Sequence, residues 1–149
     1  PVAHDFPEHR FWQHVIFNHK ALGLDWTHRL RLEQRRIGEM QQQNGDWHVS
    51  NWRYENRIRY MLRTTIPLSD DKKWYLALWD ELFINFGSNV SLNYLDQNRA
   101  FIGLGRKLSE TTRLEIGFME QTVQRRGGNV WENNHTISVW LMSKWPIKF

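Results

Sequence analysis

The chain has 149 residues, with 20 Lys and Arg against 16 Asp and Glu, a net charge of +4 and a pI near 9.6. This length suits one domain, the absence of Cys excludes disulfides and thiolate chemistry, and no apolar run is long enough for a transmembrane helix. Arg is spread along the chain and does not cluster in a tail, which argues against a nucleic-acid partner. We therefore treat 1–149 as a single domain.

Alternation of apolar and polar residues predicts seven β-strands and no helix. The strands are expected at 10–20, 24–37, 51–68, 73–87, 96–108, 112–125 and 133–149. Short connections (21–23, 69–72 and 109–111) alternate with longer ones rich in Gly, Asn and Trp (38–50, 88–95 and 126–132). Short turns at one end and long loops at the other are typical of outer-membrane barrels, in which the short turns are periplasmic.

One face of the predicted strands is charged, with Arg and Glu interleaved and Gly at intervals. A soluble surface more often uses Lys, Ser and Thr, so this pattern indicates packed charge ladders in a narrow polar lumen. The residues assigned to the lumen are Arg29, Arg31, Glu33, Arg57, Arg59, Glu81, Arg99, Arg113 and Glu115.

The opposite face is apolar and aromatic, and its large rings lie near strand ends. The residues assigned to a membrane girdle are Trp26, Trp52, Trp74, Trp145 and the terminal Phe149. The sequence thus predicts an all-β, antiparallel up-and-down transmembrane barrel of the bacterial outer membrane, in contact with outer-membrane lipids including lipopolysaccharide. The alternative is a soluble lipocalin-like ligand-binding barrel with an aromatic core.

Two adjacent acids, Asp80 and Glu81, conflict with a strict alternation, because one of them must face outward unless the strand bulges. A charge at mid-bilayer is costly on the lipid face of a barrel. We expect a bulge at Asp80; the alternative is that this part of the outward face meets protein. Outward parity is also expected for His28, Asn56, Asn98 and Glu120.

The strand count predicts an incomplete barrel. If Phe149 is periplasmic, seven strands place the start of the first strand outside the cell. Bacterial single-chain barrels have an even number of strands, at least about eight. We therefore expect the barrel to be completed by missing N-terminal strands or by another chain.

Several segments support this expectation: Glu-His-Arg-Phe-Trp-Gln at 8–13, His-Arg-Leu-Arg-Leu-Glu-Gln-Arg at 28–35, Arg-Ile-Arg-Tyr at 57–60, Trp-Asp-Glu-Leu-Phe-Ile-Asn at 79–85, Asp-Gln-Asn-Arg at 96–99, Gly-Leu-Gly at 103–105 and Arg-Leu-Glu-Ile-Gly at 113–117. Together they resemble a family of predicted bacterial outer-membrane barrels, domain of unknown function 2490. The resemblance implies further strands before Glu8. It implies no catalytic residue, because the family has no assigned activity.

Three classes of function remain open from the sequence. The first is a barrel with a structural, partner-binding or narrow-pore role. The second is a lipid-modifying enzyme, which needs a Ser nucleophile beside a His base. The candidate residues are His14, His19, His28 and His135 with Ser109, Ser138 and Ser143. They form no recognisable sequence motif, so no catalytic residue is assigned.

The third class is binding of a cation or of lipopolysaccharide at the outer rim. Hard cations take oxygen ligands, and phosphates take Arg. The candidate oxygen ligands are Asp96, Asn98, Glu120 and Glu132, and the candidate phosphate contacts are Arg125 and Arg126. No spacing singles out a site, so no metal and no cofactor are assigned.

Overall fold

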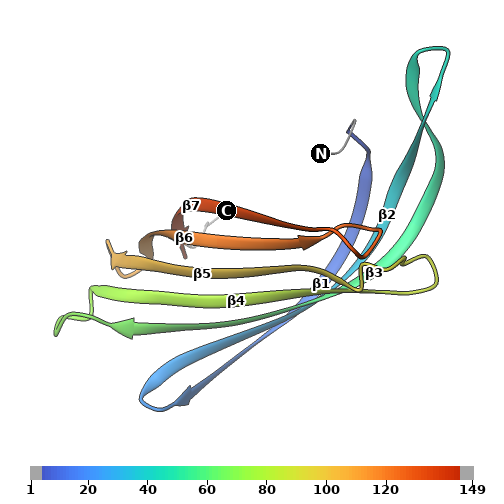
Figure 1. Ribbon diagram of the computed structural model, residues 1–149. Coiled ribbons are helices and arrows are strands. Elements are labelled where there is room, and N and C mark those ends of the chain that lie inside the picture. Colours follow the sequence, from blue (N-terminus) through green and yellow to red (C-terminus); the bar gives the residue numbers. More distant parts are fainter. Residues whose placement is uncertain (1–4, 145–149) are drawn as a thin grey trace, which may run out of the picture.

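The computed structural model describes residues 5–144, which form one seven-stranded antiparallel sheet. Each strand pairs with the next in chain order (Figure 1). The strands are β1 (Glu8–Ala21), β2 (Leu24–Gln43), β3 (Asp46–Pro67), β4 (Trp74–Phe86), β5 (Leu95–Lys107), β6 (Thr112–Gln124) and β7 (Trp131–Ser143). The predicted all-β, up-and-down order of seven strands is confirmed. The predicted end of the last strand, with Trp145 and Phe149, lies outside the described residues.

No helix in the described part of the chain is long and apolar enough to cross a membrane.

The hairpin of β2 and β3 is longer than the sequence predicts. The loop expected at 38–50 is wrong, because β2 continues to Gln43 and β3 begins at Asp46. Asn44 and Gly45 have φ angles of 54° and 91°. These left-handed conformations suit a two-residue hairpin turn, for which Asn-Gly is a preferred pair. The hairpin therefore projects beyond the other strands (Figure 1).

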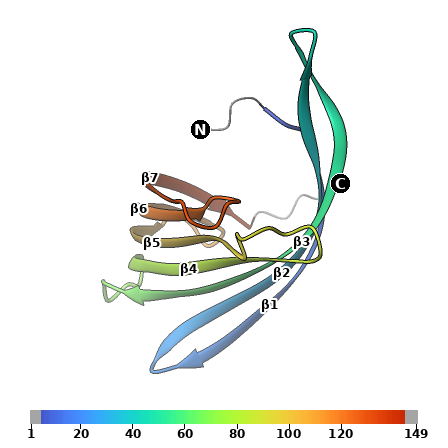
Figure 2. The same ribbon diagram turned by 45° about the vertical axis from the view of Figure 1, so that its right-hand side comes forward.

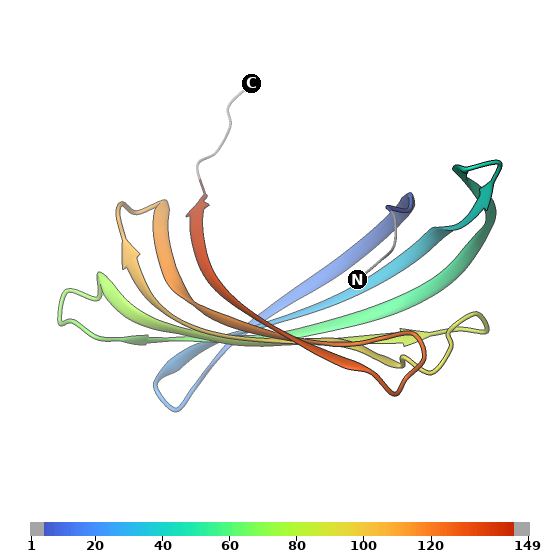
Figure 3. The same ribbon diagram turned by 45° about the horizontal axis from the view of Figure 1, so that its top comes forward.

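The sheet curves into an open trough (Figures 2 and 3). The charged face is the concave one, because side chains of strands that are not neighbours meet there. Arg29 of β2 reaches Glu81 of β4, and Arg63 of β3 reaches Glu115 of β6. Within residues 5–144, β1 pairs only with β2 and β7 only with β6, so the sheet is not closed.

The bulge predicted at Asp80 is wrong. Asp80 pairs in regular register with Leu62 on β3 and Ala100 on β5, so its side chain stays on the convex face. There it accepts hydrogen bonds of 3.1 and 3.0 Å from the Asn98 amide. The register shift on these strands lies instead between Phe83 and Ile84, opposite β5. Regular alternation thus places Glu81 on the concave face and Asp80 on the convex one.

Glycines on β5 leave room for aromatic rings on the concave face of β4 to β6. The buried apolar cluster is small and consists of Tyr75, Ala77 and Phe101. A Cβ atom at Gly105 would overlap the ring of Tyr75, and one at Gly103 would come within 2.5 Å of the ring of Phe101. The two rings can therefore lie flat against the sheet only because these positions lack a side chain.

Candidate functional site on the concave face

Six side chains form a connected arginine–glutamate network in the middle of the trough: Arg29, Glu33, Arg57, Arg59, Glu81 and Asp96. Arg57 donates to Glu33 at 2.9 and 2.6 Å, and Arg59 donates to it at 2.9 Å. Arg59 also donates to both oxygens of Glu81, at 3.0 Å each, and Arg29 donates at 2.8 Å. Glu33 is 0% and Glu81 3% exposed. Charges this buried are tolerable only because each has opposite partners.

A buried aromatic ring lies under the network. Phe83 is 2% exposed, and the guanidinium groups of Arg57, Arg59 and Arg99 lie 5.2, 4.3 and 5.1 Å from its ring centroid. Cations over a ring face are attracted by its quadrupole. The ring therefore holds three like charges from β3 and β5 close together. Arg31 is also close to the network, with a guanidinium nitrogen 4.0 Å from a carboxylate oxygen of Glu33.

The bulge on β5 supplies the sixth member of the network. Ile84 pairs with Leu95 and Phe83 with Gln97, so Asp96 is the extra residue between two ladder positions. Its carboxylate accepts a 2.6 Å hydrogen bond from Arg57. A bulge re-aims a side chain in this way, and here it adds an acid to the concave face.

Further ion pairs continue the network toward the end of the trough that carries the long loops. Arg35 donates to Glu8 at 2.9 and 3.0 Å, and Arg53 donates to Glu55 at 2.6 Å. Arg53 also donates to Glu39 at 2.8 Å, and this hydrogen bond lowers the pKa of the solvent-exposed Glu39 carboxyl below its ordinary value. Positive charges at this end are therefore matched by carboxylates.

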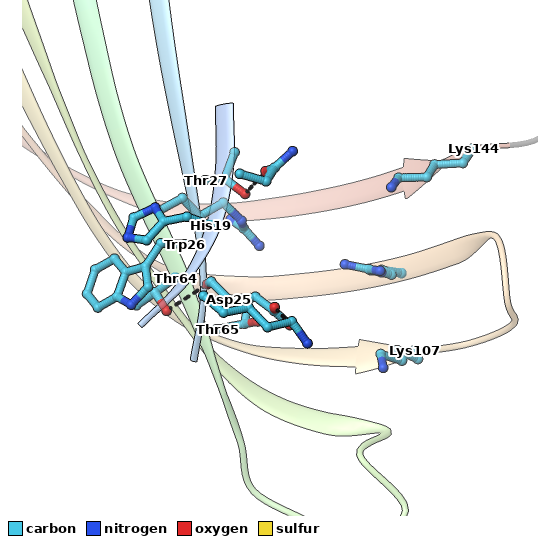
Figure 4. Close-up of a pocket in the computed structure, with 12 residues that line it drawn as sticks. His19, Asp25, Trp26, Thr27, Thr64, Thr65, Lys107 and Lys144 are labelled. Atoms are coloured by element: carbon cyan, nitrogen blue, oxygen red, sulfur yellow. Dashed lines mark hydrogen bonds and ion pairs between the residues drawn. The ribbon is translucent and has the colours of Figure 1, made fainter. Parts of the chain in front are cut away.

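The opposite end of the trough, where the short turns lie, contains a hollow of about 480 Å³. We call it the basic hollow, because its lining carries five cationic side chains and one acid: Lys20, Arg63, Lys107, Arg113, Lys144 and Asp25. Figure 4 shows Lys107 and Lys144 on one side and His19, Asp25, Thr27 and Thr65 on the other. Residues from five strands, together with Lys144 just after β7, thus converge on one space.

Glu115 lies next to the basic hollow, because it is paired with the lining residue Arg63. It is 1% exposed, forms an ion pair with Arg63 and accepts a 2.8 Å hydrogen bond from the Tyr75 hydroxyl. Beyond it lies a second hollow of about 410 Å³, which we call the central hollow. Its lining mixes Arg29, Arg59, Arg63 and Arg99 with Met61, Trp79, Met119, Trp140 and Met142. Arg63 lines both spaces, so they are neighbours.

All nine residues assigned to a lumen belong to the concave face. Arg29, Glu33, Arg57, Arg59 and Glu81 are in the network, Arg31 and Arg99 flank it, Glu115 forms the floor, and Arg113 lines the basic hollow. The lumen assignment did not include Lys107, Lys144 or Glu8. Alternation places Lys107 on the same polar face as Arg113, and the register of β5 and β6 puts the two directly opposite each other.

Three of the predicted girdle residues lie in the described part of the chain, on the convex side. The Trp26 indole donates a 3.1 Å hydrogen bond to the Ala21 carbonyl. Trp52 lies with its ring centroid 5.0 Å from that of His9, and Trp74 has the Arg106 guanidinium 5.0 Å from its ring. Trp26 and Trp74 lie near the starts of β2 and β4. The expected position of Trp52 near a strand end is wrong, because β3 begins at Asp46 and Trp52 lies six residues inside it.

Three of the candidate enzyme residues, His19, His28 and Ser109, make contacts that the structure defines. On the convex face His28 is hydrogen-bonded to the Tyr60 hydroxyl at 2.6 Å and to His19 at 3.1 Å. Ser109 uses its hydroxyl within the β5–β6 turn, where it accepts from the backbone N–H groups of Thr111 and Thr112. These groups therefore serve local structure.

The candidate rim ligands point in different directions. Asp96 binds Arg57 on the concave face, whereas Asn98 binds Asp80 on the convex face. Glu132 accepts two hydrogen bonds of 2.6 Å from Arg125. They do not converge on one cation.

Comparison with known proteins gives a family and no activity. The chain is 28% identical over 129 residues to an uncharacterized protein of Methylorubrum extorquens, a match that covers 83% of this chain and 50% of that protein. The chain therefore spans about half the length of this curated relative. No solved structure matches the chain. The family model described as "Protein of unknown function (DUF2490)" matches residues 1–133, and the chain belongs to that family.

Proposed function

We propose that this chain is part of an integral β-barrel of the bacterial outer membrane, with an ion-paired lumen and a structural, partner-binding or narrow-pore role. The observation that carries the proposal is an uncovered apolar band on the convex face, inclined to the strands. A soluble barrel has the reverse arrangement, with apolar residues inside and polar residues outside.

The apolar band follows all seven strands and has no covering layer. Val15 on β1 is 69% exposed, Ile102 on β5 is 51% exposed, and Val139 on β7 is 64% exposed. The facing concave side is filled with ion pairs. Exposed apolar patches of this extent indicate a contact with membrane or protein.

The inclination of the band fits a flat slab of lipid. Following the ladder from Val139, the paired positions are Ile116, Leu104, Leu76 and Ile66. The residue before Ile66, Thr65, pairs with Asp25, and the residue before Asp25, Leu24, pairs with Ala21, so Ala21 lies in the same row. On β1, however, the apolar stretch is centred near Val15, about six residues above Ala21, a drift of roughly one residue per strand. With a rise of about 3.3 Å per residue and a spacing of about 4.8 Å, this drift corresponds to strands tilted by about 35°, as in barrels.

The proposal includes further strands that close the sheet. The edges of β1 and β7 are unpaired within residues 5–144, and a barrel leaves no open edge. The curated relative is about twice as long as the matched segment, which leaves room for such strands. We propose that these strands pair with β1 and β7.

The experiment measures depth in a bilayer, and residues 1–149 contain no Cys that would compete for the label. The full-length protein is reconstituted in vesicles with one spin label at a time, at Val15→Cys, Val139→Cys or Ala21→Cys. Collision with oxygen and with a water-soluble nickel chelate reports depth. We expect the labels at positions 15 and 139 to lie equally deep, and the label at 21, which shares the ladder row of 139, to lie near the surface.

Labels at all three sites that collide freely with the nickel chelate contradict the membrane proposal. Equal depth for positions 21 and 139 contradicts the tilt. The role is tested separately by conductance in planar bilayers: a narrow pore gives small resolved openings, whereas a silent bilayer favours a structural or partner-binding barrel.

A further inference from the structure

We propose that the basic hollow is a binding site for a phosphate-bearing anion. The inference goes beyond the proposed function and does not need the chain to lie in a membrane, because it rests on the charges and the space at one end of the trough.

The first argument is an excess of unmatched positive charge. Lys107, Arg113 and Lys144 line the basic hollow, and no carboxylate among residues 5–144 lies within 4.0 Å of their side-chain nitrogens. The lining acid, Asp25, pairs with Lys20 at 3.6 Å, and both of these side chains are largely exposed. Arg63 is already paired with Glu115. Three cations therefore face the space without a partner in this part of the chain.

The second argument is the placement of two of these cations. Lys107 and Arg113 are directly opposite each other on β5 and β6. Like charges in such a cross-strand pair repel each other and destabilise the sheet. Arg31 and Arg59 are also directly opposite each other, on β2 and β3, but both lie within 4.0 Å of the Glu33 carboxylate, whereas Lys107 and Arg113 have no such partner among residues 5–144. An anion bound between the two side chains removes the repulsion.

The third argument is the chemistry of the lining. Thr27, Thr65 and Asn18 add hydroxyl and amide groups to the cations. A phosphate group carries close to two negative charges and three strong acceptor oxygens, which suits point-charge Lys and forked Arg donors arriving from several strands. The volume of about 480 Å³ is in the range of small-molecule sites. A single carboxylate supplies one charge and satisfies fewer of these donors.

The phosphate group has two sources, a soluble phosphate compound or a phospholipid headgroup, and the test separates them. The full-length protein in zwitterionic detergent is titrated with inorganic phosphate, and in a second arm it is placed in nanodiscs with and without phosphatidylglycerol. Phosphorus NMR line broadening reports binding in both arms. The double variant Lys107→Gln/Arg113→Gln is compared with the matched control Lys72→Gln/Lys73→Gln, which removes two charges from the neighbouring β3–β4 turn.

We expect saturable binding of at least one probe, weakened by tenfold or more in the hollow variant and by less than twofold in the control. Binding that weakens as salt rises also supports the site. Saturation by phosphate assigns a soluble ligand, and a response confined to phosphatidylglycerol assigns a headgroup.

Absence of saturable binding by both probes overturns the proposal, as does equal weakening in the control. Tryptophan emission spectra check that each variant folds, and the single variant Lys107→Gln replaces the double one if it does not. Failure of the membrane proposal is detected by the spin-label depths, so the two outcomes remain distinguishable.

Discussion

The two ends of the concave face are built from the same residue types in opposite ways. In the middle and toward the long loops, arginines are locked to carboxylates, as in the contact of Arg57 and Arg59 with the buried Glu33. At the short-turn end, Lys107 and Arg113 lie side by side on β5 and β6 and line an open space. The comparison shows that this sheet can place a carboxylate beside a buried arginine. Cations that lack a carboxylate therefore mark the end of the trough where an anionic ligand is expected.

The largest effect is expected from removing an acid at the matched end. Glu33→Gln leaves Arg57 and Arg59 buried without their shared carboxylate, which should cost about 3–5 kcal/mol of unfolding free energy. Urea unfolding of the full-length protein in micelles, followed by tryptophan fluorescence, measures it. The exposed turn residue Glu110 provides the control Glu110→Gln, expected to change stability by less than about 0.5 kcal/mol. Equal effects of the two changes would show that the network adds no stability.

A smaller effect is expected at the floor between the two ends. Gly105→Ala places a methyl group against the ring of Tyr75, whose hydroxyl donates to Glu115. Overpacking of this kind costs about 1–3 kcal/mol. Ala100→Val, on the same strand but on the exposed convex face, serves as the control. If both variants unfold at the same urea concentration as the parent, the close packing at Gly105 is not what holds the ring.

The unmatched end should respond in the opposite direction. In buffer without phosphate, Lys107→Gln removes the charge opposite Arg113 and should stabilise the protein by about 0.2–1 kcal/mol. The same unfolding measurement detects the gain, with Lys72→Gln as the control in a neighbouring turn. A loss of stability in Lys107→Gln would mean that Lys107 is already matched by a carboxylate outside the described residues.

The smallest effect concerns pH at the rim of the matched end. The Arg53 hydrogen bond lowers the pKa of Glu39, so its stabilising contribution is complete above the ordinary Glu value and is lost as pH falls through the lowered value. A carbon NMR titration of the Glu39 carboxyl follows this change. We expect Arg53→Gln to raise the Glu39 pKa toward its ordinary value and Arg10→Gln to leave it unchanged. No difference between the variants refutes the assignment to Arg53.

Much of this arrangement could be predicted from the sequence, because a period of two residues assigns each side chain to one of two faces. The concave placement of Glu33 and Arg59 follows from that rule alone. The Asn44-Gly45 turn also had a signal, but the polar residues around it suggested a loop. The bulge at Asp96 had none, because it lies at the start of β5, where only Leu95 precedes it in the strand and a change of alternation cannot be seen.

The basic hollow could not be predicted for a different reason. Lys107 and Lys144 lie on one side of the trough and Asp25 on the other (Figure 4), and the distance between the two sides depends on how strongly the sheet curves. Curvature is set by the sum of twist, bulges and glycine positions over several strands. Alternation gives the face on which each residue lies, but it does not tell which residues of distant strands come together across the trough.

The edges of β1 and β7, which are unpaired within residues 5–144, affect how the chain behaves in the cell and in the test tube. The outer edge of β1 is a row of free backbone donors and acceptors along a 14-residue strand, beside exposed side chains such as Phe17 at 61%. Such an edge is a template for adding any extended chain, and self-association is the usual result. Residues 1–149 expressed alone should therefore aggregate through edge pairing. Correct assembly requires that the proper closing strand pairs with β1 before a second copy of the chain does.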